Sequence, residues 1–267
     1  MGGRRPGTGG TPPHTGGGPA NRLVKQAFET TAGRMREAGF DVGDGVEVVV
    51  DPRLPIMGYT VPGEGGRFRI VVSGGAVESG MLEGLLAHEM SHIVRMRTRH
   101  PSHNPRIIEA AIRQVGDGVA TTDYQRKILH DLVNNVEDLY ADDIAFDVIR
   151  KVGLMTAKEA TEFLQNWVED APSEARDRTR ARWENAWRLA NNARAIAQME
   201  RHGVEDTGGV AAAASDRLLS RMGPAARGPF EYLRNLLVNL KKGITEDEYR
   251  KLLVDYLGRF LEVAERT

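Results

Sequence analysis

The stretch Leu85-Leu86-Ala87-His88-Glu89-Met90-Ser91-His92-Ile93-Val94 decides how this chain is interpreted, because it contains an H-E-x-x-H motif. On a helix, two histidines four residues apart lie one turn apart on the same face, so their imidazoles can converge on one small cation. Neutral imidazole nitrogens at about 2.0–2.1 Å suit tetrahedral Zn²⁺. Glu89 projects toward the same cavity, where it can accept a proton from metal-activated water.

The surroundings of the motif predict a helix. Apolar residues recur at helical spacing from Met81 to Val94, no proline interrupts them, and Ser79 can cap the start. The alternative is a buried helix whose two histidines only satisfy local hydrogen bonds. A metal site also needs a third ligand. The metal site is favoured over this alternative because the chain contains a suitable residue for that role.

Composition limits the classes of function. The 267 residues suffice for one large domain, or for a domain with a helical extension. Lys and Arg total 36 against 37 Asp and Glu, so no global field selects nucleic acid or membrane. The absence of cysteine excludes disulfides and fits a reducing compartment. No apolar run approaches the ~18 residues of a membrane span, and the N-terminus lacks the apolar core of a signal peptide. We therefore expect a cytoplasmic protein with no membrane partner.

The pattern of apolar residues predicts an α+β fold in three regions. Residues 1–20 are a disordered tail rich in Gly and Pro. Residues 21–155 hold a helix, three short strands, the H-E-x-x-H helix and a long helix that starts at a capping box. Residues 156–267 form a mostly helical C-terminal region. The three strands are expected near residues 46–50, 57–61 and 68–72.

The third metal ligand is expected on the long helix. The histidine-rich alternative would need Gly and His at positions that hold Arg95 and Thr98. His100 and His103 lie in the following loop and would need a special fold to reach the metal. The acidic pair Glu137-Asp138 is the better source of a ligand.

Helical geometry chooses between the two carboxylates. At about 100° per residue, Glu137 lies at the margin of the apolar stripe of the helix and Asp138 lies roughly opposite its centre. Glu137 is therefore favoured, while Asp138 stays open as a ligand or as the acid that orients a ligating histidine. Asp142 and Asp143 are interpreted as part of a solvated acidic face.

With these residues the chain resembles a gluzincin, the class of zinc metallopeptidases in which a Glu on a later helix completes an HExxH site. The resemblance covers about residues 21–153 and implies a zincin-like domain over residues 21–155. It implies that His88, His92 and Glu137 bind Zn²⁺ and that Glu89 is general base and later proton donor. It also implies that an edge strand, expected around Phe68–Val72, pairs with an extended peptide.

The chain departs from the gluzincin pattern at one place. Thermolysin-like and CAAX-protease-like branches carry E-x-x-x-D, but Ala141 follows Glu137 by four residues, whereas Asp142 follows Asp138. Either Asp138 is the ligand in a shifted register, or Glu137 binds and the supporting acid comes from elsewhere.

The function expected from the motif is zinc metalloendopeptidase activity on a peptide or protein substrate. The residue that stabilises the oxyanion is left open among His130, Tyr140 and His202. The alternative is a non-catalytic, metal-binding regulatory or interaction protein with a helical platform. Nucleic-acid binding through the arginines between Arg176 and Arg194 is disfavoured, because acidic residues are interleaved with them. The sequence does not give the oligomeric state.

Overall fold

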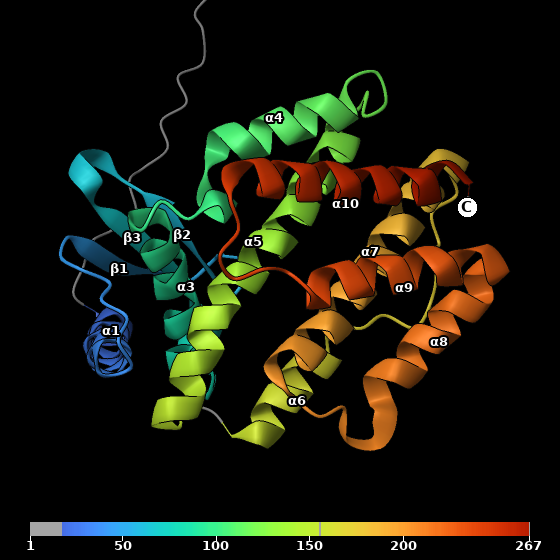
Figure 1. Ribbon diagram of the computed structural model, residues 1–267. Helices are drawn as coiled ribbons and strands as arrows, with labels where there is room; N and C mark the ends of the chain where they lie inside the picture. The colour runs from blue at the N-terminus through green and yellow to red at the C-terminus, as the bar shows by residue number, and fades with distance from the viewer. Residues whose placement is uncertain (1–17, 155, 267) are drawn as a thin grey trace, which may run out of the picture.

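A computed structural model describes residues 18–154 and 156–266, which form an α+β fold (Figure 1). A small three-stranded sheet lies near the N-terminus, and the C-terminal region is mostly helical, so the predicted fold class is confirmed. The predicted tail falls almost wholly on residues 1–17, which lie outside the described residues. None of the helices within the described ranges is both long and apolar enough to cross a membrane.

The sheet follows helix α1 (Pro19–Glu37) and consists of β1 (Val46–Asp51), β2 (Gly58–Pro62) and β3 (Phe68–Ser73). The strand order is β1-β3-β2, with β3 parallel to β1 and antiparallel to β2. The expectation that the strand around residues 68–72 is an edge is therefore wrong. Five of its six residues are buried, as a central strand requires, and β2 is the edge beside the H-E-x-x-H helix.

Helix α3 (Leu82–Arg97) carries the motif and follows the short helix α2 (Gly74–Glu78). It packs against α1, β2 and α5. The core between these elements is formed by apolar side chains that are fully excluded from solvent: Met35, Ile70, Val72, Leu86, Met90, Ile93 and Val148.

Helix α5 (Asp123–Val152) connects the two halves of the molecule. It begins at the expected capping box of Thr122 and Gln125 and ends at Gly153 in the left-handed conformation. Its first half packs against α4 (Pro105–Gly116) and the C-terminal helices, while its second half packs against α3. The helix is therefore buried on more than one side.

The C-terminal region contains α6 (Ala157–Gln165), α7 (Arg178–His202), α8 (Val210–Met222), α9 (Arg227–Val238) and α10 (Glu246–Arg266). One apolar core joins α4 and the first half of α5 to α7, α9 and α10, so packing crosses the predicted boundary at residue 155. In Figure 1, α10 lies beside α4 in the upper part of the view. The sequence did not predict α2 or α8.

Replacing Gly58 by Ala should destabilise the protein by displacing β2. A Cβ at this position would lie 3.0 Å from the carbonyl oxygen of Val71 and 3.3 Å from the side chain of Leu85. We expect the free energy of unfolding in urea to fall by about 1 kcal/mol. The control is Gly75→Ala, because Gly75 is helical and exposed, and a Cβ added there would meet no heavy atom within 4 Å. Equal stability of the two variants would contradict the tight packing of β2.

Candidate metal centre

The two histidines of the motif converge as the helical spacing predicts. His88 and His92 project from α3 toward α5, and their Nε2 atoms lie 3.1 Å apart. Both side chains are mostly shielded from solvent. Two imidazole nitrogens at this distance are placed to share one positive ion.

Asp138 of α5 supplies the third group. Its Oδ1 atom lies 3.4 Å from Nε2 of His92 and 3.8 Å from Nε2 of His88. Ligands held tetrahedrally at about 2.0–2.1 Å from Zn²⁺ are about 3.3 Å from one another. The three observed separations lie around this value, so the residues fit a tetrahedral ion with one corner left for a further ligand.

The structure groups Asp138, rather than the expected Glu137, with the two histidines. Glu137 lines the same cavity, where burial and the neighbouring charge of Asp138 raise its pKa to about 8. The expectation assumed that the face of α5 opposite its apolar stripe meets solvent. That face meets α3 and α7 instead, and Asp142 and Asp143, which were interpreted as solvated, are only 5% and 6% exposed.

Asp142 orients the first histidine. Its Oδ1 atom lies 2.6 Å from Nδ1 of His88, and its Oδ2 atom accepts a hydrogen bond from Gln198 of α7. Asp138 and Asp142 are one turn apart on α5, so the pair has the D-x-x-x-D register that the sequence left open. A carboxylate on the outer nitrogen of a ligating histidine fixes the tautomer that presents Nε2 to a metal.

The second oxygen of Asp138 is also engaged. Its Oδ2 atom accepts a hydrogen bond of 3.2 Å from the guanidinium of Arg194 on α7. Arg194 is 2% exposed, and its guanidinium lies 4.0 Å from the ring centroid of Trp167. The sequence interpretation had considered Arg194 only as part of a disfavoured nucleic-acid surface, but the structure places it in the interior behind the site.

His103 reaches the site from the short 3₁₀ helix Pro101–His103, which follows α3. Its Nε2 atom lies 2.7 Å from Nδ1 of His92, on the side away from His88. Burial, with the neighbouring rings of His92 and His100, lowers the pKa of His103 to about 2, so this ring is neutral. His103 therefore lies behind His92 and outside the cluster of His88, His92 and Asp138.

Glu89 shares a cavity of about 400 Å³ with these residues. It is 5% exposed, and its Oε2 atom accepts a 2.7 Å hydrogen bond from Thr60 of the edge strand β2. The sequence interpretation did not identify Thr60, because nothing local links residue 60 to residue 89. Tyr59 and Asn134 also line the cavity.

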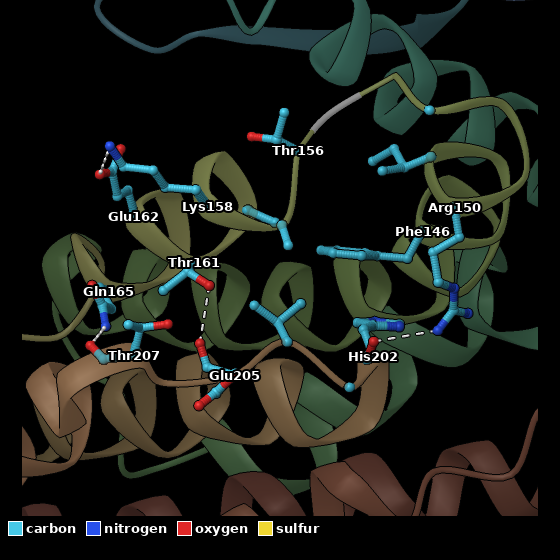
Figure 2. Close-up of a pocket in the computed structure, with 16 residues that line it drawn as sticks. Phe146, Arg150, Thr156, Lys158, Thr161, Glu162, Gln165, His202, Glu205 and Thr207 are labelled. Atoms are coloured by element: carbon cyan, nitrogen blue, oxygen red, sulfur yellow. Dashed lines mark hydrogen bonds and ion pairs between the residues drawn. The ribbon is translucent and has the colours of Figure 1, made fainter.

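The three side chains considered for the oxyanion do not line this cavity. His130 is exposed, and Tyr140 is fully buried in the core of the C-terminal half. His202 lies in a second cavity of about 780 Å³ between α5, α6 and the end of α7, where its ring stacks on Phe146 at 4.4 Å (Figure 2).

The electrostatics of the site favour a positive charge. Burial alone lowers the pKa of His88, but Asp142, Asp138 and Glu89 outweigh it and raise that pKa to about 10. The pKa of Asp138 lies well below its ordinary value, because contacts with His92, Arg194 and His88 outweigh its burial. In the metal-free protein, a proton on His88 satisfies this demand for positive charge. A divalent cation bound there would supply positive charge in its place.

The protein is thus an α+β protein in which two packed helices bring two histidines and an aspartate together. The chain belongs to a family of unknown function (DUF5781), whose model matches residues 31–262. No curated protein and no solved structure matches the chain. The matched span includes all the residues of the candidate site.

Replacing Asp142 by Asn should lower the pKa of His88 in the metal-free protein, because the carboxylate that stabilises its imidazolium is lost. NMR titration of the ring nitrogens measures the change. In the wild type, folding raises this pKa from 6.5 to about 10, so the contribution of His88 to stability is full below pH 6.5 and disappears as the pH approaches 10. Asp131→Asn, a change on the same helix at a residue paired with Lys127, is the control. An unaltered His88 pKa in the Asp142 variant would contradict the contact.

Proposed function

We propose that the protein is a zinc-dependent metallopeptidase that hydrolyses peptide bonds. The observation that carries the proposal is the set of separations of 3.1, 3.4 and 3.8 Å between the ligand atoms of His88, His92 and Asp138. Glu89 lies in the same cavity. A purely structural zinc site usually has four protein ligands and does not need a carboxylate beside an open position.

The residues of the cavity support defined roles. A bound Zn²⁺ would polarise the scissile carbonyl and lower the pKa of a coordinated water toward 7. Glu89 would take the proton of the attacking water and then deliver it to the leaving amine. Thr60 holds the Glu89 carboxylate by one oxygen, which keeps it directed into the cavity. Tyr59 and Asn134 line the cavity and would supply polar groups for the oxyanion.

The edge strand supports a peptide or protein as the substrate. Strand β2 pairs with β3 on one side, and its other side is a free edge within the described sheet. An extended peptide can add to such an edge through backbone hydrogen bonds. Ile56 and Tyr59, both exposed, lie where this strand meets the cavity.

We also propose that the protein is located in the cytoplasm, because the chain contains no cysteine.

The variant Glu89→Gln should retain the metal and lose peptidase activity by a factor of about 100 or more, because the amide cannot accept the proton. Activity is measured on a denatured protein and on quenched fluorescent peptides, with the metal content determined by elemental analysis. Glu83→Gln is the matched control, since it makes the same change on the same helix at a residue paired with Arg34. Wild-type activity in the Glu89 variant would refute the role of Glu89.

The variants Asp138→Asn and Glu137→Gln test the third ligand. We expect the first to lose most of its bound zinc, because a neutral amide replaces the carboxylate that faces both histidines. The Glu137→Gln variant should keep about one equivalent of zinc. Elemental analysis of the purified proteins gives the answer, and zinc lost only from the Glu137 variant would return the assignment to that residue.

A non-catalytic metal-binding protein is the second candidate. The hydrogen bond between Asp138 and the buried Arg194 favours this second candidate, because a carboxylate fixed by an interior residue also suits a structural metal site. Zinc bound in the purified protein without cleavage of any denatured protein would select this function. Nucleic-acid binding is not proposed, since Arg180 and Arg188 pair with acidic residues and Arg194 is interior.

A further inference from the structure

A chain of hydrogen-bonding groups leads from the outer face of His92 to a backbone carbonyl of the C-terminal region. Nδ1 of His92 lies 2.7 Å from Nε2 of His103, and Nδ1 of His103 lies 2.7 Å from Oγ of Ser102. The same Oγ lies 2.8 Å from Nδ1 of His100, and Nε2 of His100 lies 3.1 Å from the carbonyl oxygen of Lys242. Lys242 belongs to the segment between α9 and α10.

The last member of this chain fixes the direction of every hydrogen bond. A carbonyl oxygen can only accept, so Nε2 of His100 donates to Lys242. In the neutral ring Nδ1 of His100 then accepts, both from the hydroxyl of Ser102 and from its backbone N–H at 3.2 Å. Burial lowers the pKa of His100 and so favours the neutral ring.

The directions of the remaining hydrogen bonds, up to the candidate metal site, follow in the same way. Because the hydroxyl of Ser102 donates to His100, its oxygen accepts from Nδ1 of His103. Nε2 of His103 therefore carries a lone pair and accepts from Nδ1 of His92. The proton of His92 is thus placed on Nδ1, and its Nε2 lone pair faces His88 and Asp138.

We propose that His103 is a positioning residue that holds His92 in its metal-ligating tautomer and orientation, through a hydrogen-bond chain anchored at the carbonyl of Lys242. The inference deepens the proposed function, on which it rests. It assigns to the segment between α9 and α10 a part in metal binding, although Lys242 lies 142 residues along the chain from His100.

The segment that carries the chain is rigidly held. Ser102 is fully buried, and Pro101 opens the 3₁₀ helix. Asn104 donates a 3.1 Å hydrogen bond to Glu246 in the first turn of α10. The segment after α3 is therefore attached to α10 by side chains as well as through His100. Such an anchored acceptor limits the rotation of the His92 ring.

The experiment compares His103→Leu with His103→Gln. Leu removes the acceptor for Nδ1 of His92, whereas the carbonyl oxygen of Gln can replace Nε2 of His103. We expect Leu to weaken Zn²⁺ binding by about 10–100-fold, the usual loss when a group behind a metal ligand is removed. Gln should restore most of the affinity. A chelator competition assay measures the affinity, and the visible spectrum of the Co²⁺-loaded protein reports the ligand geometry, which a merely structural defect would not change.

His130→Leu is the control, because it makes the same substitution at an exposed histidine outside the site. Equal metal affinity and an unchanged Co²⁺ spectrum in wild type and His103→Leu would overturn the role of His103. Failure of Gln to restore either one would also overturn it. Wild-type protein that binds neither ion would overturn the proposed function and this inference together. Tight metal binding that depends on His103, without peptidase activity, would support the inference and refute only the peptidase.

Discussion

The ion pair between Asp138, which is partly exposed, and Arg194, which is buried, is the interaction on which the candidate site depends. Asp138 faces two histidines with one oxygen and Arg194 with the other, so the carboxylate is engaged on both sides. A buried carboxylate without partners would take up a proton or unfold its surroundings. The guanidinium supplies charge and fixed hydrogen-bond geometry, and loss of the carboxylate would leave the buried charge of Arg194 without this partner. Arg194 therefore helps to keep the Asp138 carboxylate ionised at the candidate site.

This requirement explains why the C-terminal helices are part of the site and not an appendage. Helix α7 contributes Arg194 to Asp138, Gln198 to Asp142 and Arg201 to Asp143. The first two pairs are each separated by 56 residues, so successive turns of α5 meet successive turns of α7. A set of polar pairs of this kind also favours one register between the two helices, because a shift by one turn would separate each donor from its present acceptor.

The local features of this protein could be predicted from its sequence. The three strands, the long helix with its capping box and the convergence of His88 with His92 all follow from periodicities within a few residues. The sequence favoured Glu137 as the third ligand, whereas the structure groups Asp138 with the histidines. The difference arises because a helical wheel shows which face is apolar but not what packs against the polar face. The acidic face of α5 was expected to meet water, yet it meets α3 and α7. Thr60 and Arg194 were missed for the same reason, since each acts on a residue more than 25 positions away.

One signal in the sequence matches the register in which the structure groups Asp138 with the histidines. The spacing of Asp138 and Asp142 on α5 equals that of Arg194 and Gln198 on α7, and one helix supplies the acceptors for donors on the other. Glu137 is not followed by a second carboxylate one turn later on α5, because the residue four positions on is Ala141. A carboxylate that is to ligate a metal in the interior needs a second group to satisfy its other oxygen. The residue with that support, and not the residue nearest the apolar stripe, is the one that the fold directs at the histidines.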